Sequence, residues 1–228
     1  MIKPKKPLIP PQAERTFFDY FLLPADAEEV LDSFGYSFEA RLCPLPQAPV
    51  AADRLAALRS RLEAGLPLIS LTSETARREF LIAPVLWEVA TATQAKIRVE
   101  YPLAVDPQLK GTLDYYLRGK NNLLVVEAKN ADLERGFVQL AVELVALDKW
   151  LDDALPMLYG AVSIGNIWQF GLLHRRRRHV TQDLKLYRVP DDLGDLLAIL
   201  TAILKNGEAA SRRTPQTGSQ KRAGQRKP

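Results

Sequence analysis

The stretch "LLVVEAKN", residues 123–130, places charged side chains directly after four consecutive apolar residues. The apolar run Leu123–Val126 predicts a strand that is buried on both faces. Glu127 and Lys129 stand two positions apart, so on a regular strand they point to the same face. A Glu-x-Lys pair is common on solvated strands, so this pair indicates a functional centre only if further functional side chains lie next to it.

A second carboxylate stands on the strand predicted before this one, "GTLDYYLRG" at residues 111–119, and "KNN" at 120–122 predicts a tight turn between the two. The resulting hairpin brings Asp114 beside Glu127. Two carboxylates that close repel each other unless a cation or a proton lies between them. A Mg²⁺ ion with water ligands fits that gap. Lys129 would then hold an attacking water or stabilise negative charge in the transition state.

Helices are expected on both sides of these strands. In chain order, the expected elements are a helix over 72–93, strands over 95–105, 111–119 and 123–129, a helix over 132–153, one or two strands over 157–174 and a helix over 191–206. Pro84 should kink or split the first helix. This order predicts an α/β sandwich around a mixed sheet.

Asp114 and the run Glu127-Ala128-Lys129, between a Glu-bearing and a Gln-bearing helix, resemble the PD-(D/E)XK nuclease superfamily. The stretches "SETARREFLIAPVLWEV" and "VVEAK" are similar to the nuclease domain of type I restriction enzyme motor subunits. The element order is also similar to that of small bacterial, especially cyanobacterial, members. The resemblance covers roughly residues 70–205. It implies the restriction endonuclease-like fold, an α-β-β-β-α-β sandwich with a central mixed sheet.

The resemblance also implies roles for individual residues. They are Asp114 and Glu127 as metal ligands, Ala128 as a ligand through its carbonyl, Lys129 as the catalytic lysine and Gln139 as a residue that steadies the site. Leu113 departs from the family, because it stands where the motif has proline. The implied cofactor is Mg²⁺ or Mn²⁺.

The acid on the first helix is open between Glu74, Glu79 and Glu88. At about 100° per residue, these lie roughly 60°, 80° and 100° from the centre of the apolar face. This favours Glu74, with Glu79 close behind. Arg78 lies nearest that centre, one turn after Glu74, so the two side chains can pair.

Charge is distributed unevenly along the 228 residues, whose formal net charge is +4. Residues 1–15 and 207–228 are basic and are expected to be disordered. Residues 16–69 are expected to form a mostly helical extension, and 70–206 the nuclease-like domain. Arg175, Arg176, Arg177 and Arg178 form a basic loop that is expected to contact phosphates, with nucleic acid, DNA above all, as the partner.

Several functional classes are disfavoured. The single cysteine, Cys43, rules out an internal disulfide and a multi-cysteine zinc site. The only two histidines, His174 and His179, flank the arginines, which disfavours a His-rich metal site and a Ser-His-Asp triad. No apolar run approaches the roughly 20 residues of a membrane span. The basic, Pro-rich start does not look like a signal peptide, so a cytoplasmic protein without membrane contact is expected.

Two functional hypotheses follow. The first is a metal-dependent nuclease, an endonuclease by expectation, that hydrolyses phosphodiester bonds. The second is an inactive module with the same fold, which binds nucleic acid or a partner subunit of a restriction, defence or repair complex. This is an alternative because a fold can be retained after its catalytic activity has been lost. A homodimer is compatible with both.

Overall fold

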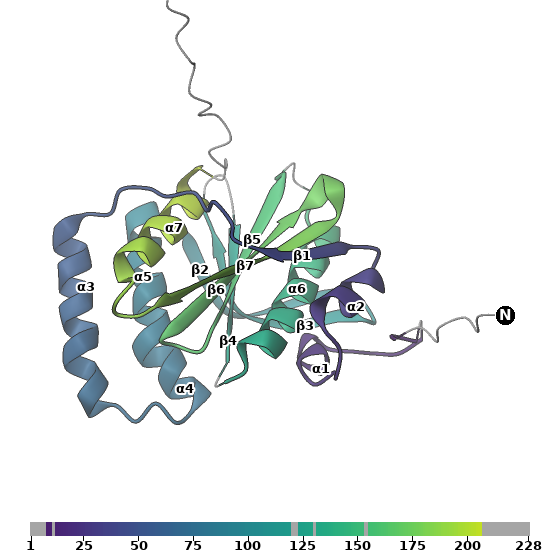
Figure 1. Cartoon of the computed structure of the whole chain (residues 1–228), viewed down its shortest axis with the longest axis horizontal. Coiled ribbons are helices and arrows are strands. Elements are labelled where there is room, and N and C mark those ends of the chain that lie inside the picture. Colours follow the sequence, from purple (N-terminus) through teal and green to yellow (C-terminus); the bar gives the residue numbers. More distant parts are fainter. Residues whose placement is uncertain (1–7, 11, 120–122, 130, 153–154, 207–228) are drawn as a thin grey trace, which may run out of the picture.

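The computed structural model describes residues 8–10, 12–119, 123–129, 131–152 and 155–206. The predicted turn at 120–122, the basic tail at 207–228 and residues 1–7 of the basic start lie outside this part of the chain. The described chain folds into one mixed β-sheet between two layers of helices (Figure 1). The predicted α/β sandwich with a mixed sheet is therefore confirmed.

The sheet has seven strands in the order β1-β7-β6-β5-β4-β3-β2. Their bounds are Ser37–Arg41 for β1, Lys96–Asp106 for β2, Leu109–Arg118 for β3, Leu123–Ala128 for β4, Met157–Ser163 for β5, Ile167–His174 for β6 and His179–Arg188 for β7. The pairs β4–β5 and β1–β7 are parallel, and the other neighbouring strands are antiparallel. The sequence pattern predicted strands β2 to β6 and did not predict β7.

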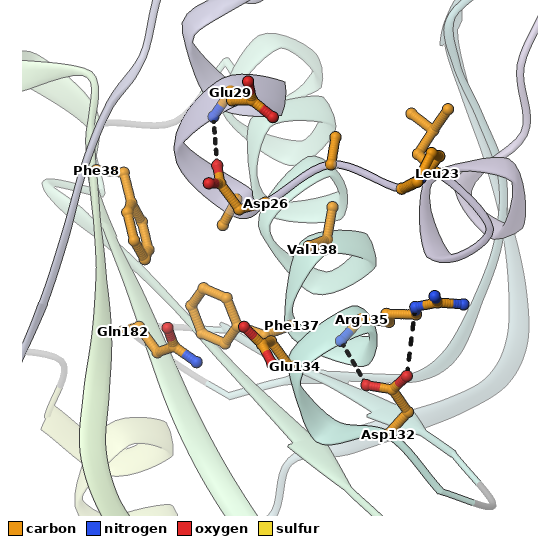
Figure 2. A pocket seen from close by; sticks show the side chains of 13 residues that line it. Leu23, Asp26, Glu29, Phe38, Asp132, Glu134, Arg135, Phe137, Val138 and Gln182 are labelled. Carbon is orange, nitrogen blue, oxygen red and sulfur yellow. Dashed lines mark hydrogen bonds and ion pairs between the residues drawn. The ribbon is translucent and has the colours of Figure 1, made fainter.

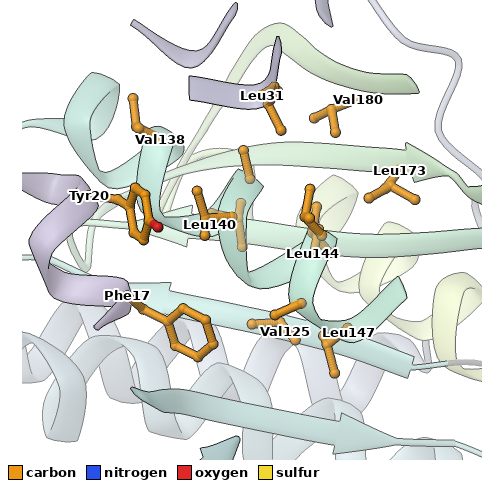
Figure 3. Close-up of a cluster of buried hydrophobic side chains, with 14 of the residues drawn as sticks. Phe17, Tyr20, Leu31, Val125, Val138, Leu140, Leu144, Leu147, Leu173 and Val180 are labelled. Atoms are coloured by element: carbon orange, nitrogen blue, oxygen red, sulfur yellow. The ribbon is translucent and has the colours of Figure 1, made fainter. Parts of the chain in front are cut away.

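Each face of the sheet carries its own set of helices and its own hydrophobic cluster. The helices α1 (Phe17–Phe21), α2 (Ala27–Asp32) and α6 (Leu133–Trp150) cover one face, while α3 (Ala52–Gly65), α5 (Ala83–Thr93) and α7 (Leu193–Asn206) cover the other. In the first cluster, side chains of α1 and α6 meet those of β4 (Figure 3). Trp168 and Phe170 are fully buried in the second cluster.

The first long helix is split, as the position of Pro84 predicted. It consists of α4 (Glu74–Arg77), a π-helical turn η2 (Arg78–Ile82) and α5. Proline has no backbone N–H and cannot donate to the carbonyl four residues earlier, so the helical ladder changes register there. The Ser73 hydroxyl caps α4 by accepting a hydrogen bond from the Ala76 N–H at 3.1 Å.

The N-terminal segment is packed into the same body. Strand β1 extends the sheet by pairing with β7, with Ser37 opposite His179, and a short 3-10 helix η1 (Leu66–Leu68) follows α3. Ile9 is buried in the first cluster and the Arg15 N–H donates to the Pro107 carbonyl at 2.9 Å. Residues 8–10 and 12–15 thus pack on the protein, in contrast to the disorder expected over 1–15, because Ile9 supplies an apolar anchor.

Over the residues described by the structure, no helix has both the length and the apolar character that crossing a bilayer requires.

Candidate active site

The antiparallel pairing of β3 and β4 places two of the predicted acids side by side. Tyr115 pairs with Val126, so the next position in register sets Asp114 opposite Glu127. The Asp114 Oδ2 atom accepts a hydrogen bond from the Ala128 N–H at 2.8 Å. The structure therefore brings Asp114 to the charged end of β4, as the hairpin predicted.

Helix α6 completes a polar cluster on the same face of the sheet. Glu127 Oε1 lies 2.5 Å from Lys129 Nζ and accepts a hydrogen bond from Gln139 Nε2 at 2.7 Å. The same amide group donates to Glu143 Oε1 at 2.9 Å. Glu127 is 1% exposed and Lys129 6% exposed. We call these four residues together with Asp114 the acid–lysine centre.

A glycine allows α6 to come this close to the strands. A Cβ atom on Gly136 would lie 2.7 Å from Val162 Cγ2 and 3.1 Å from Lys129 Cγ. Asp132 begins the helix, with its side chain accepting a hydrogen bond from the Arg135 N–H at 3.0 Å. The start of α6 is therefore fixed directly above Lys129.

Burial changes the proton affinities of the centre. Burial raises the pKa of Glu127 well above its usual range, and the nearby charge of Asp114 adds to this, while Lys129 opposes it. Burial likewise raises the pKa of Glu143, with the charge of Glu127 as the next cause. Burial alone would lower the pKa of Lys129, but the Glu127 carboxylate raises it, so Lys129 is an ammonium at neutral pH.

Three oxygen atoms of the centre are buried without a donor in the part of the chain that is described. They are Glu127 Oε2, Gln139 Oε1 and Glu143 Oε2. A buried acceptor left unpaired costs about 1–3 kcal/mol, so such atoms call for an explanation. A proton held between Glu127 and Glu143 is one remedy, and a cation bound by the carboxylates is another.

The donor set fits a divalent cation of the magnesium type. Across the described ranges, no group of three or more His, Cys, Asp or Glu side chains is arranged to hold a metal ion. Mg²⁺, however, is commonly held by only one or two carboxylates, with water filling its other positions. Asp114 and Glu127 supply two carboxylates on adjacent strands, and Glu127 Oε2 has no donor that a cation would have to displace.

The three candidate acids of the first helix point to different places. Glu74, in the first turn of α4, lies near enough to Lys129 for its charge to raise the pKa of that ammonium. Glu79 instead lines a groove together with Trp87. Glu88 forms an ion pair with Arg54 of α3. Of the three candidates, Glu74 is therefore the one whose charge acts on Lys129 of the acid–lysine centre.

Arg78 reaches the centre in a way that the sequence did not reveal. Its Nη1 atom lies 3.6 Å from Asp114 Oδ1 and 3.5 Å from Glu100 Oε1, and its guanidinium lies over the Tyr115 ring at 5.4 Å. The helical wheel had suggested a pair with Glu74. The π-helical turn changes the direction of the side chains after Arg77, which a regular wheel cannot anticipate.

Two aromatic rings of α1 cover Lys129. Its Nζ atom lies 5.0 Å from the centroid of the Phe21 ring and 5.7 Å from that of Phe18. The two rings are nearly parallel, at 16°, with centroids 5.8 Å apart. Sequence reasoning assigned no role to this segment, and a five-residue helix gives no periodic signal that could have shown its neighbour.

The four arginines of the basic loop have different surroundings. Arg175 is held to α6, with Nε 2.6 Å from Asp148 Oδ1 and further hydrogen bonds to the carbonyls of Asp148, Leu151 and Leu155. The guanidinium of Arg178 lies 5.9 Å from the Tyr36 ring.

Arg176 and Arg177 are exposed, and Arg177 lines a cavity of about 420 Å³. Of the four predicted phosphate contacts, Arg175 therefore has a structural role in the loop, while Arg176 and Arg177 face solvent.

That cavity contains a second polar group, on the sheet face opposite to the acid–lysine centre. Ser37 Oγ lies 2.8 Å from His179 Nδ1, and His179 Nε2 lies 3.2 Å from Glu39 Oε1. The same oxygen accepts hydrogen bonds from Arg41 Nε at 2.6 Å and from Thr181 Oγ1 at 3.4 Å. We call these five residues the edge cluster. Its hydroxyl–imidazole–carboxylate contacts were not foreseen, because they join strands far apart in the sequence.

An acidic groove of about 440 Å³ borders α6 at its start (Figure 2). Asp26, Glu29, Asp132 and Glu134 line it, and Phe137 lies on its inner side. Arg135, also in its lining, is paired with Asp132 at 3.4 Å. The excess of carboxylates makes this groove unfavourable for phosphate groups.

The chain matches no protein-family model, no curated protein and no solved structure. What the acid–lysine centre can do therefore follows from its own residues. It joins a pair of carboxylates suited to a hard cation, an ammonium that stays charged when buried, and an amide that fixes one carboxylate. Such a set is suited to stabilising negative charge that develops on a bound oxyanion.

Proposed function

We propose that the protein is a metal-dependent nuclease that hydrolyses phosphodiester bonds of nucleic acid, DNA above all, at the acid–lysine centre. The observation that carries the proposal is the meeting of Asp114, Glu127 and Lys129 at one buried point, with Glu127 Oε2 left without a donor among the described residues. The element order from α4 to β5, helix, three strands, helix and strand, supports a restriction endonuclease-like fold. An endonuclease is the expected class.

Four residues of the centre would have a task in this reaction. Asp114 and Glu127 would hold Mg²⁺ or Mn²⁺, with the Ala128 carbonyl as a further ligand, and the bound ion would supply a Lewis acid at the phosphate. Lys129 places its ammonium where negative charge develops on the phosphoryl oxygens. Gln139 fixes the carboxylate of Glu127 through its 2.7 Å hydrogen bond.

Two further side chains shape the approach to the centre. Glu74 adds a negative charge beside Lys129, which helps to keep the ammonium protonated. The ring of Phe21 lies beside Lys129 Nζ, with its centroid 5.0 Å away, and forms one side of the approach to that atom.

The test is cleavage of plasmid and single-stranded DNA by purified protein, with Mg²⁺ or Mn²⁺ against EDTA. We expect cleavage that requires metal and falls by about 10²-fold or more in Lys129→Ala. Glu127→Gln, which keeps the shape of the side chain, should lose activity as well. Lys185→Ala is the matched control, because Lys185 forms a surface ion pair with Asp195.

Circular dichroism confirms that the variants are folded. Absence of cleavage with every metal, while wild type and Lys129→Ala retain DNA equally on a gel, would exclude a self-sufficient nuclease.

A second candidate is a module that keeps this fold to bind nucleic acid or a partner subunit. The near-complete burial of Glu127 and Lys129 favours it, because both are closed off from solvent. Such a module need not bind Mg²⁺, and Lys129→Ala would leave its binding intact. Calorimetric titration with Mg²⁺ separates the two candidates, and co-purification with mass determination reports a homodimer or a partner chain.

A further inference from the structure

Helix α1 is fixed to the protein by two side chains on its inner face. Phe17 and Tyr20 are buried in the first hydrophobic cluster (Figure 3). The Tyr20 hydroxyl donates to the Gln108 carbonyl at 2.8 Å. Gly111, at φ +150°, lets β3 approach, since a Cβ there would lie 2.8 Å from the Phe17 ring. The backbone of α1 therefore has a defined position beside the acid–lysine centre.

The outer face of the same helix carries Phe18 and Phe21. Phe18 is 53% exposed, so burial of its ring contributes little to the stability of the fold. Both rings nevertheless lie within 6 Å of Lys129 Nζ and are nearly parallel to each other. An aromatic pair that stands next to a buried cation and has one exposed ring, that of Phe18, is suited to a ligand with a flat ring and a negative charge.

We propose that Phe18 and Phe21 form the base-binding wall of the acid–lysine centre, and that its substrate is single-stranded nucleic acid. This inference rests on the proposed function, because it takes Lys129 as the group that meets the phosphate. In a nucleotide the base stands one sugar away from its phosphate. A phosphate at Lys129 therefore places the neighbouring base beside these rings.

The rings discriminate by strandedness because stacking needs a free base face. Bases in a single strand can stack on aromatic side chains whatever their identity. Bases inside a duplex already have both faces covered and would first have to be flipped out. The acidic groove at the start of α6 disfavours phosphate groups on that side (Figure 2).

The test measures binding in EDTA, so that it does not depend on catalysis. Single-stranded oligonucleotides containing 2-aminopurine report stacking by a loss of fluorescence, and anisotropy reports affinity. We expect Phe18→Ala to weaken binding of the single strand about tenfold or more and to abolish the fluorescence loss. Phe18→Tyr, which keeps a ring, should restore both. Leu22→Ala is the matched control, because Leu22 is the C-cap residue of the same helix and is 56% exposed.

An abasic oligonucleotide separates the wall from the phosphate contacts. Wild type should bind an oligonucleotide with a central abasic site more weakly than the intact strand. Phe18→Ala should bind the two equally, and binding of duplex DNA should be the same for all variants. Equal affinities of wild type and Phe18→Ala for the intact strand would refute the wall. So would tighter binding by Phe18→Ala, because the rings would then only obstruct Lys129.

The two proposals fail in different ways. If no metal supports cleavage but the binding pattern depends on Phe18 as described, the nuclease is refuted and the wall stands. If cleavage requires metal and Lys129 but neither binding nor stacking responds to Phe18→Ala, the wall is refuted and the nuclease stands.

Discussion

The chain contains the same short motif on two strands of one sheet. Glu39-Ala40-Arg41 lies on the edge strand β1 and Glu127-Ala128-Lys129 at the end of the inner strand β4. In both, the cation contacts the Oε1 atom of the glutamate two residues before it, at 2.6 Å and 2.5 Å. Their surroundings differ, since Glu39 is 42% exposed in its side chain and Glu127 is 2% exposed.

This difference reverses the effect on the proton affinity of the glutamate. The hydrogen bonds from Arg41 and then from His179 lower the pKa of Glu39. Burial raises the pKa of Glu127 in spite of Lys129. An ion pair on a strand thus says little about function by itself. The combination of burial with an unpaired oxygen distinguishes the centre on β4, because such an arrangement is costly for stability alone.

The largest expected contrast in stability is between two variants, each of which removes the cationic side chain of one motif. Lys129→Met leaves a buried carboxylate without its partner, and we expect a loss of about 3 kcal/mol in the free energy of unfolding. Arg41→Met should leave the urea midpoint nearly unchanged, because Glu39 keeps water and His179. Equal losses in both variants would show that burial does not distinguish the two motifs.

Removing the amide that joins the two buried acids should have the next largest effect. Gln139→Leu keeps the volume but deprives Glu127 and Glu143 of their shared donor, and we expect a loss of about 2 kcal/mol in urea unfolding. Thr181→Val is the control, since it removes a 3.4 Å hydrogen bond to the exposed Glu39. A smaller loss in Gln139→Leu than in Thr181→Val would contradict this assignment.

The buried acids should make stability fall as the pH rises. The pKa of Glu143 is raised in the folded state, so the contribution of this residue to stability is fully present below the ordinary pKa of glutamate. That contribution is lost as the pH rises toward the pKa that Glu143 has in the folded protein. Glu143→Gln removes this loss, since its amide can donate to Glu127 without a titrating proton. We expect the variant to gain at least about 1 kcal/mol over wild type at pH 9 relative to pH 5, measured in EDTA. If Glu143→Gln and wild type differed in stability by the same amount at pH 5 and at pH 9, this would argue against a raised pKa of Glu143.

The exposed acid should show the opposite sign and the smallest effect. A lowered pKa stabilises the fold above the ordinary value and is lost as the pH falls through the folded value. Glu39→Gln should therefore be slightly less stable than wild type at neutral pH in thermal melts, and this difference should shrink as the pH falls below about 5. A difference that grows instead as the pH falls would mean that Glu39 does not behave as an exposed, paired carboxylate.

Local patterns predicted much of the fold and part of the centre. The hairpin of β3 and β4 was enough to place Asp114, Glu127 and Lys129 together, whereas Gln139 was expected beside them only from the family resemblance. The four apolar residues before Glu127 predicted a strand that is buried on both faces, whereas "GYSF" precedes the more exposed Glu39.

What the sequence did not reveal depends on contacts between distant segments. Strand β7 has no long apolar run, and its place next to β1 follows only from the assembled sheet. Phe18 and Phe21 reach Lys129 because Phe17 and Tyr20 anchor α1, which is a result of tertiary packing. Arg78 turns toward Asp114 because the helix changes its winding at that point.

The parallel pairing of β1 with β7 has a consequence for the nascent chain. Ser37 lies beside His179, 142 positions later, so β1 leaves the ribosome long before its partner strand has been made. An unpaired strand that waits so long is a target for wrong pairing with other chains. The polar side chains Ser37, Glu39 and Arg41 alternate along β1 and keep one of its faces hydrophilic. The three residues that β1 contributes to the edge cluster therefore have a use before the protein is folded, because they protect the strand whose pairing is completed last.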